Sequence, residues 1–287
     1  MDKPFISQFD IPGIYEFHAQ QRNYEIYDFE EEDDDRCFIY FTSNAVYSPN
    51  TREAFDKRLV QGDRYDWKKN IVRPSKKAIF LRDVLKTWYI EGINSEINSI
   101  EKIADFLSEE TRGLKLTFIG SSAGGYAATL FGCLLQGERI FNFSGQMSLH
   151  KHIEPENIRA EHPLLVKYEN RAEVNRFYSL KPYIQNCSTP IFYFYPALCD
   201  LDIPQAEEVA GLGSVYRFAF NTQSHSKTCY NINFLDLFNK DNKELIDLHD
   251  KYRNKLINSF DFSLKVSGYR KTLSYALEKI RKEAKSA

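Results

Sequence analysis

The sequence predicts an α/β protein with a mainly parallel, doubly wound sheet, an N-terminal β-hairpin and helices on both faces. Three observations indicate this class. Short apolar runs that fit buried strands alternate with segments of helical periodicity along the 287 residues. The composition is 43% hydrophobic and 15% aromatic, which suffices for a sizeable core and excludes a disordered chain. No linker or repeat divides the chain, so we expect one domain over residues 1–287.

The N-terminal third provides the hairpin and the first parallel strands. Residues 14–19 and 24–29 are aromatic and β-branched runs separated by four polar residues, which is typical of a β-hairpin. The acidic run over residues 30–35 predicts a solvated loop, because consecutive carboxylates diverge and do not converge on a calcium ion. Residues 37–41 and 77–81 are apolar, as expected of strands that are covered on both faces.

Helix and strand patterns then alternate along the chain. Residues 95–110 have apolar side chains at three- and four-residue steps, which predicts a helix with Ser95 as its N-cap. Strands are expected at residues 114–119, 139–143, 190–195 and 215–220, and helices at residues 126–135 and 205–210.

Two segments stand apart from this alternation. Residues 148–186 are polar, with helices expected around residues 164–178, and could form a cap or lid insertion over a site. Residues 262–287 predict a C-terminal amphipathic helix, which we expect to pack on its own domain, with a homodimer contact as the alternative. Its apolar side chains are Phe262, Val266, Tyr269, Leu273, Leu277 and Ile280.

The bulk properties exclude several classes of protein. A net charge of -2 gives no bulk attraction to nucleic acid or to an anionic membrane. The five cysteines include no C-x-x-C pair, so neither a disulfide framework nor a zinc site is predicted. A metal pair at His150 and His152 lacks an evident carboxylate partner, so we expect no metal. No stretch approaches 18 apolar residues, and the expected location is cytoplasmic.

One motif predicts chemistry. Gly120, Ser122 and Gly124 match the G-x-S-x-G nucleophile elbow, a sharp strand-to-helix turn that lifts the serine hydroxyl above the sheet. An ordinary glycine loop or a phosphate-binding turn are the alternatives. The apolar strand before the motif and the apolar helix after it favour the elbow. Ser121 is the competing hydroxyl, but the flanking glycines are symmetric about Ser122.

A serine nucleophile needs a base, and the base needs a carboxylate. In this elbow architecture the chain order is serine, acid, histidine. His225 is the candidate base, because it alone of the six histidines follows the acid directly after a predicted strand. Asp200 is the candidate acid, since it follows a strand and lies four residues before Pro204. Asp202 in the same loop is the alternative, and Asp200 would then only cap the next helix.

The oxyanion of an acyl-transfer intermediate needs backbone N–H donors. The residue after the nucleophile, Ala123, is one expected donor. The second is expected from the loop that follows the strand over residues 37–41, at Ser43 or Asn44.

With these residues the chain resembles the α/β-hydrolase superfamily over roughly residues 12–240. More narrowly, it is similar to bacterial capsule O-acetyltransferases of that fold and to the glycan-acetylating component of the accessory secretion system. The narrower resemblance rests on residues 41–43, the elbow over residues 120–125, residues 142–146, and the loops that contain Asp200 and His225. It implies a covalent acyl-enzyme on Ser122 and a sugar hydroxyl as acceptor.

The leading hypothesis is therefore acyl transfer through an acyl-Ser122 intermediate. Water as acceptor would make the protein an esterase. A glycan hydroxyl would make it an O-acetyltransferase with acetyl-CoA as a possible donor and no bound cofactor. The alternatives are a general carboxylic-ester hydrolase for a small substrate and a non-catalytic scaffold in polysaccharide assembly. Aromatic residues such as Trp67 and Trp88 could line a carbohydrate groove, although core packing is the favoured interpretation.

Overall fold

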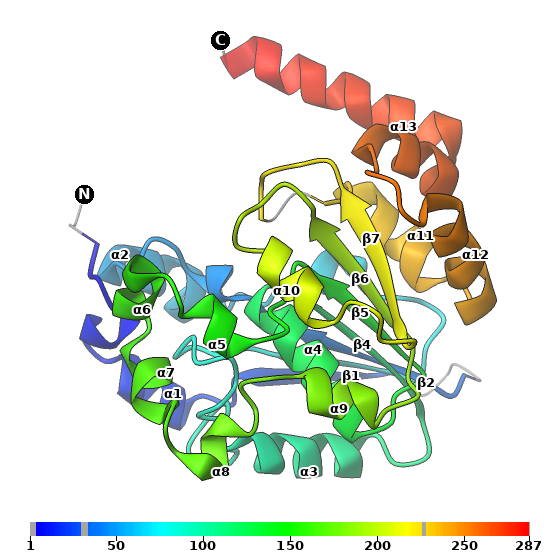
Figure 1. The fold of residues 1–287 in the computed structure, drawn as a ribbon. Helices are drawn as coiled ribbons and strands as arrows, with labels where there is room; N and C mark the ends of the chain where they lie inside the picture. Colours follow the sequence, from blue (N-terminus) through cyan, green and yellow to red (C-terminus); the bar gives the residue numbers. More distant parts are fainter. Residues whose placement is uncertain (1–3, 30–33, 226–227, 287) are drawn as a thin grey trace.

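The computed structural model describes residues 4–29, 34–225 and 228–286, which build a seven-stranded sheet between layers of helices (Figure 1). The strands are β1 (Tyr24–Asp28), β2 (Arg36–Phe41), β3 (Lys77–Leu81), β4 (Lys115–Ser121), β5 (Arg139–Phe143), β6 (Ile191–Pro196) and β7 (Val215–Phe220). Their order in the sheet is β1-β3-β2-β4-β5-β6-β7. Only β1 is antiparallel to its neighbour, so the predicted mainly parallel α/β sheet is confirmed.

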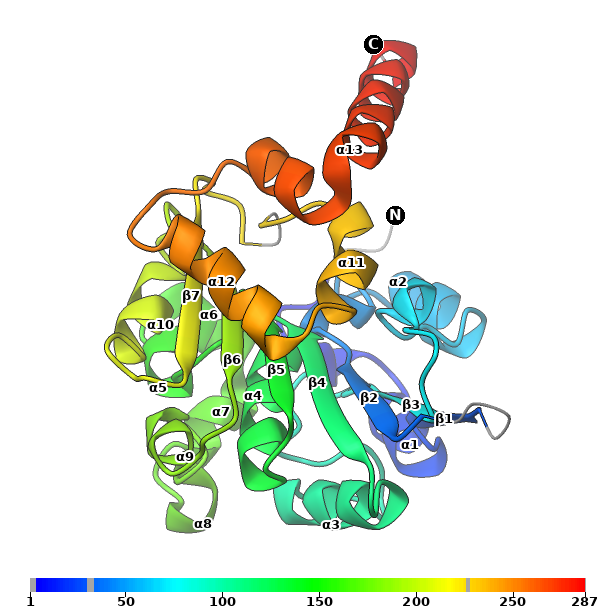
Figure 2. The same cartoon turned by 90° about the vertical axis from the view of Figure 1, so that its right-hand side faces the viewer.

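Helices lie on both faces of the sheet (Figure 2). The α-helices are α1 (Ile14–Gln20), α2 (Arg52–Phe55), α3 (Ile100–Glu110), α4 (Ala123–Leu134), α5 (Leu149–His152), α6 (Glu156–Glu161), α7 (Pro163–Tyr168), α8 (Ala172–Asn175), α9 (Lys181–Gln185), α10 (Ile203–Glu208), α11 (Phe234–Phe238), α12 (Asn242–Tyr252) and α13 (Ser259–Ser286). Short helical turns are η1 (Gln8–Asp10), η2 (Asn44–Val46), η3 (Asp56–Val60), η4 (Lys68–Asn70) and η5 (Asn231–Asn233).

The strands are apolar because each one is buried on two sides. In β2, Cys37, Ile39 and Phe41 pack with α3 and α4 on one face of the sheet. Phe38 and Tyr40 point to the opposite face and pack with α11 and α12. Alternate side chains of one strand thus enter two separate cores, which explains why strand periodicity of two is invisible in the sequence.

The predicted N-terminal hairpin is wrong. Residues 14–19 fall in α1, and β1 pairs with β3 in the register Tyr24 to Leu81. Ile14 and His18 are buried four residues apart, which is the spacing of one helix face and not of a strand. Ile14 anchors this face in a small cluster with Ile11, Val46, Tyr47, Phe55, Leu59, Val84 and Leu85.

The acidic run is only partly within the described residues, because positions 30–33 lie outside them. Asp34 forms an ion pair with Arg36 at 2.8 Å, and Asp35 forms one with Lys115 at 2.8 Å. These two carboxylates therefore pair with basic side chains at the start of β2 and β4.

The helix predicted to start at Ser95 begins at Ile100 instead, with Ser99 as its N-cap. The reason is local. Oδ1 of Asn94 accepts a hydrogen bond from the backbone N–H of Ile97 at 2.7 Å, and this bond holds residues 94–97 in a turn. The other predicted helices and strands are confirmed with ends shifted by a few residues.

Residues 148–186 connect β5 to β6 through α5, α6, α7, α8 and α9, and the helices expected around residues 164–178 are confirmed as α7 and α8. Several of their side chains belong to the core: Leu149, Ile153, Leu165, Tyr178 and Leu180. His152 and His162 face a cavity described below. A lid role for this segment stays a prediction.

The C-terminal helix packs on the protein only in its first part. Gly268, with φ 78° and ψ 167°, interrupts α13, and Phe262 and Val266 before it are buried. For about two turns after Gly268 the helix still contacts the protein, since Thr272 is buried, Lys271 pairs with Asp236, and the ring of Tyr275 packs on that of Tyr230.

The C-terminal end of α13 extends away from the rest of the protein (Figure 1). Three of the predicted apolar side chains after Gly268 are exposed: Tyr269, Leu277 and Ile280. The expected packing on its own domain therefore holds for the first part of the helix and not for its C-terminal end. Within the described residues, no helix is both long and apolar enough to cross a membrane.

Candidate active site

Ser122 lies at a sharp turn between β4 and α4. β4 is the middle strand of the sheet, so this turn stands at the centre of its carboxyl edge. Ser122 has φ 51° and ψ −124°, a conformation that side chains with a Cβ rarely adopt. Two backbone hydrogen bonds hold it there: the Ser122 N–H donates to the Phe143 carbonyl at 2.9 Å, and the Tyr126 N–H donates to the Ser122 carbonyl at 3.0 Å. This backbone is that of a nucleophile elbow.

The glycines on either side of Ser122 are required by close backbone contacts. A Cβ on Gly120 would lie 1.9 Å from the carbonyl oxygen of Gly124. A Cβ on Gly124 would lie 2.3 Å from the carbonyl oxygen of Phe41, at the end of β2. The G-x-S-x-G pattern thus allows the turn to close on itself and brings the loop after β2 beside the nucleophile.

We expect Gly124→Ala to destabilise the protein by about 3 kcal/mol or more, because the added methyl collides with backbone that cannot rotate away. Helix propensity alone would make the alanine variant more stable by about 1 kcal/mol. A decrease in the free energy of unfolding would therefore indicate that the added methyl group collides with the Phe41 carbonyl. Urea unfolding measures it. Gly213→Ala is the matched control, since its Cβ would meet no atom within 4 Å. Equal stability of the two variants would contradict the described packing.

His225 connects Ser122 to a carboxylate. Its Nε2 lies 3.0 Å from the Oγ of Ser122, and its Nδ1 lies 2.8 Å from Oδ2 of Asp202. Asp202 follows β6 at the start of α10, and His225 lies in the loop after β7. The Asp202 side chain is 1% exposed, whereas that of His225 is 32% exposed. The three side chains thus form a continuous serine–histidine–aspartate hydrogen-bond relay in which the carboxylate is buried and the imidazole is partly exposed.

Asp200 does not take part in this relay, so the structure corrects the first choice of acid in favour of Asp202. The cause is the turn before α10, in which the Cys199 carbonyl accepts the N–H groups of Asp202 and Ile203 at 2.9 and 3.0 Å. Because of this turn, Asp202 lies on the same side as the buried face of α10, whereas Asp200 is exposed. The buried residues of that face are Cys199, Asp202, Gln205, Ala206 and Val209.

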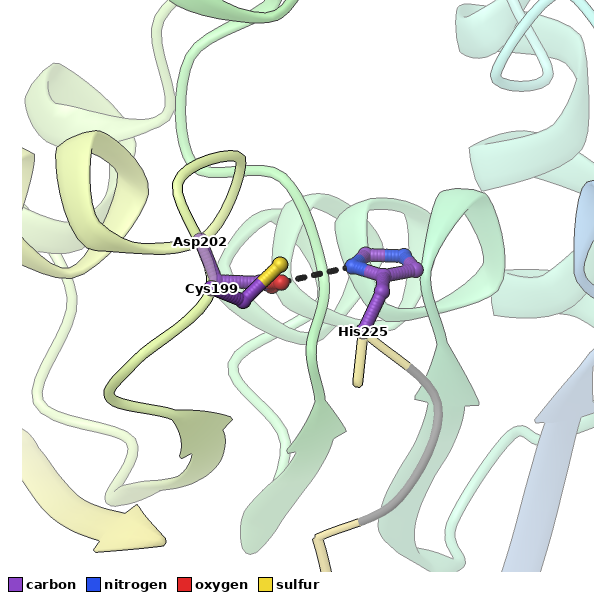
Figure 3. Close-up of side chains that lie close together, drawn as sticks. All are labelled: Cys199, Asp202 and His225. Carbon is purple, nitrogen blue, oxygen red and sulfur yellow. Dashed lines mark hydrogen bonds and ion pairs between the residues drawn. The ribbon is translucent and has the colours of Figure 1, made fainter. Parts of the chain in front are cut away.

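Cys199 is a neighbour of the relay that sequence patterns did not reveal. Ligating atoms of Cys199, Asp202 and His225 lie within 4.8 Å of one another (Figure 3). Such a group could hold a metal ion in principle. However, burial and a hydrogen bond to Asp202 raise the pKa of the Cys199 thiol, which disfavours the thiolate that a metal binds. Both ring nitrogens of His225 are also engaged. The three side chains are thus arranged as a hydrogen-bond relay, with Asp202 accepting from the other two.

The expected oxyanion donors divide into two groups. The backbone N–H of Ser43 donates to the Asp66 carboxylate at 3.0 Å and is not available, so this part of the prediction is wrong. Within the described part of the chain, no hydrogen bond occupies the N–H of Ala123 or of Asn44. Ala123 is the first residue of α4, whose initial N–H groups have no partner in the helix. Ala123 and Asn44 remain as candidate donors.

Two cavities meet at Ser122 and His225. The first, the Trp67 cavity, has a volume of about 370 Å³. It is lined by Ser43, Ala45, Asp66, Trp67, Asn70, Ser121, Phe143, Ser144, Thr228, Cys229, Asn231 and Phe234 besides the shared pair. The second, the Lys86 cavity, has a volume of about 330 Å³. Its other lining residues are Gln8, Asn44, Ser48, Asn50, Lys86, Trp88, Gln146, Ile158, Glu161, Leu201 and the two histidines His152 and His162. Each cavity therefore contains one of the two tryptophans of the chain.

The fold class follows from these features together. A nucleophile elbow at the carboxyl edge of a mainly parallel sheet, with the chain order serine, aspartate, histidine, defines the α/β-hydrolase fold. The predicted fold class is confirmed.

No protein-family model and no curated protein matches the sequence. Among solved structures, the chain is similar to the capsule O-acetyltransferase of Neisseria meningitidis serogroup A, with 14% identity over 81% of this chain and 90% of that one and a TM-score of 0.47. A mutant of that enzyme in complex with CoA has 12% identity over 81% and 91%, with a TM-score of 0.46. An α/β-hydrolase superfamily protein from Enterococcus faecalis has 13% identity over 79% and 92%, with a TM-score of 0.46.

Proposed function

We propose that this α/β-hydrolase-fold protein is a serine acyl-transfer enzyme, an O-acetyltransferase or acetyl esterase that acts on a bacterial surface polysaccharide or glycan. The observation that carries the proposal is the continuous relay from the Ser122 hydroxyl through His225 to the buried Asp202. Ser122 also has the strained backbone of a nucleophile elbow, which supports the same role.

The relay supports a two-step reaction. In the first step, His225 Nε2 accepts the Ser122 proton while Oγ bonds to the acyl carbon, and the leaving group departs with a proton from the imidazole. In the second step, His225 accepts a proton from water or from a sugar hydroxyl, whose oxygen attacks the acyl carbon. The bond from the acyl carbon to Oγ then breaks, and the imidazolium returns the proton to Oγ. Asp202 holds the imidazole by its Nδ1 and stabilises its charged form. The N–H groups of Ala123 and Asn44 would receive the negative oxygen in both steps.

Two cavities at one nucleophile favour transfer between two substrates. One cavity can hold the donor side of the acyl group while the other admits the acceptor hydroxyl. The sequence resemblance to capsule O-acetyltransferases, at the elbow and at the loop after β2, makes acetyl-CoA the donor to test. General hydrolysis of a small ester is the second candidate, since the same relay activates water.

The test has two arms. A fluorophosphonate probe is expected to label the wild-type protein on Ser122, as identified by peptide mass spectrometry. Loss of acetyl-CoA is then followed with and without polysaccharide acceptors, beside hydrolysis of a chromogenic acetate ester, in the presence of a chelator. Acceptor-dependent use of acetyl-CoA supports the transferase. Ester hydrolysis without any use of acetyl-CoA would leave the esterase, and absence of labelling would favour a non-catalytic scaffold.

A further inference from the structure

We propose that the Lys86 cavity is a binding site for an oxyanion, a carboxylate or phosphate group carried by the molecule that reacts at Ser122. This inference rests on the proposed function only for its link to Ser122. The cavity opens on the nucleophile and on the base, so a ligand held there lies beside the reacting atoms. Its lining combines a buried cation, unpartnered imidazoles and a strained loop.

Lys86 is a buried lysine without an ion-pair partner among the described residues, and burial lowers the pKa of its ammonium group to about 7. Its side chain is largely inaccessible, with 6% relative exposure of the residue, and its Nζ donates to the Tyr47 carbonyl at 2.8 Å and to Asn50 Oδ1 at 2.7 Å. Both acceptors are neutral, and within the described residues no carboxylate forms an ion pair with Lys86. An ammonium group has three donors, and the third N–H of Lys86 has no oxygen or nitrogen acceptor among the described residues. Its Nζ also lies 3.7 Å from the centroid of the Tyr47 ring. A buried charge of this kind is costly unless it is paired, and an anion in the cavity would pair it.

Two histidines of the cavity have unused ring nitrogens. Nε2 of His152 and Nδ1 of His162 are buried and have no hydrogen-bond partner. The centroids of the two imidazole rings are 5.5 Å apart, and each lies 4.8 Å from the ring centroid of Trp88. Burial lowers the pKa of His152 to about 3 and that of His162 to about 4, so both are neutral at pH 7. A neutral imidazole can donate one hydrogen bond, and a bound anion would accept it and raise both pKa values.

The loop that presents Lys86 is held in an uncommon backbone conformation. Lys86, Trp88 and Tyr89 all have positive φ, at 54°, 57° and 63°. The buried Asp83 carboxylate accepts the N–H groups of Thr87 and Tyr89 and thereby fixes this turn. Strained residues persist where the surroundings determine them and are concentrated at functional sites. Here the strain points Lys86 and Trp88 into the cavity.

The charge of the lining selects the ligand. Glu161 is the carboxylate among the lining residues of the Lys86 cavity, and it is exposed. The Trp67 cavity shows the opposite character, because its described lining includes Asp66 but no lysine or arginine. An oxyanion is therefore expected in the Lys86 cavity and not in the other. It could belong to an acidic sugar of the acceptor or to a phosphate of a CoA donor, and the chemistry of recognition is the same.

The two tryptophans allow the site to be tested directly. Trp67→Phe leaves Trp88 as the sole tryptophan, a reporter inside the Lys86 cavity, and Trp88→Phe leaves a reporter in the Trp67 cavity. At constant ionic strength, inorganic phosphate is expected to change Trp88 fluorescence saturably and to leave Trp67 fluorescence unchanged. Lys86→Met in the Trp67→Phe background is expected to weaken the phosphate affinity at least about tenfold. Lys102→Met, which removes an exposed lysine of α3, is the control with the same charge change.

Further arms identify the source of the anion. Glucuronate is compared with glucose, and CoA with pantetheine, in the same reporter protein. A preference for glucuronate that Lys86→Met removes assigns the site to the acceptor. A preference for CoA that Lys86→Met removes assigns it to the donor. Equal binding of charged and neutral partners in both pairs would overturn the proposal.

A measurement on the unsubstituted protein covers the case in which Lys86→Met does not fold. Proton NMR titration of the His152 and His162 ring signals is expected to show higher pKa values in saturating phosphate. Unchanged values, or no phosphate response of Trp88, would overturn the anion site. Because binding is measured without turnover, this result is separate from the labelling of Ser122, which alone decides the proposed function.

Discussion

Replacement of Ser122 by alanine is expected to lower turnover of the best acyl donor by about 10⁴- to 10⁶-fold. In the proposed reaction this hydroxyl forms the acyl-enzyme, and it is the hydroxyl that lies 3.0 Å from His225 Nε2. The activity that remains would come from the oxyanion donors and from substrate binding alone. The ratio of wild-type to variant turnover is obtained from initial rates with a chromogenic acetate ester, measured at several enzyme concentrations.

Ser121→Ala is the matched control for this experiment. Ser121 ends β4 and lines the Trp67 cavity one residue from the nucleophile, but within the described residues it forms no hydrogen bond with His225. Its removal is expected to change turnover by less than about tenfold. Similar losses in both variants, or a Ser122→Ala protein with near wild-type activity and an unchanged unfolding curve, would refute the nucleophile assignment.

The sheet could be predicted because each strand is an apolar run that can be recognised from its own residues. β3 and β5 have the predicted bounds, since most positions of these runs enter one of two cores and are therefore apolar. The polar exceptions are Lys77, Arg139 and Asn142. The elbow could be predicted for a related reason. Gly120 is required by a backbone contact with Gly124 inside the motif, so the motif itself records that part of the geometry. Gly124 is required by the backbone of Phe41 at the end of β2, a contact that the motif alone does not reveal.

Features that depend on distant contacts could not be predicted in the same way. Residues 14–19 form a helix because Ile14 packs against Tyr47 and Leu85, and nothing in the run itself distinguishes that helix from a strand. The Lys86 loop has no periodicity, and its shape depends on the buried carboxylate of Asp83. The relay acid lies between these cases. Asp202, Ala206 and Val209 stand four and three residues apart, which places them on one face of a helix. This spacing can be read from the sequence, and it favours Asp202 over Asp200 as the buried acid.

Asp202→Asn is expected to reduce kcat by about 10⁴-fold with little change in the shape of the site. Asparagine has the same size, but its amide would present a donor to the His225 Nδ1, which favours the imidazole tautomer that cannot accept the Ser122 proton. The lost charge also removes the stabilisation of the imidazolium formed during the reaction. Steady-state kinetics should show the loss in kcat and not in KM, and the rate of fluorophosphonate labelling should fall in parallel.

Asp200→Asn tests the same prediction from the other side, because Asp200 is two residues away in the same turn and is exposed. It carries the same change of charge and size, so any effect of the substitution as such appears in both variants. We expect its kcat to remain within a few-fold of the wild-type value. Comparable losses in the two variants would mean that the loop, and not the Asp202 carboxylate, controls the activity. A large loss in Asp200→Asn alone would reverse the assignment of the acid, since only a carboxylate in contact with His225 Nδ1 can select the reactive tautomer.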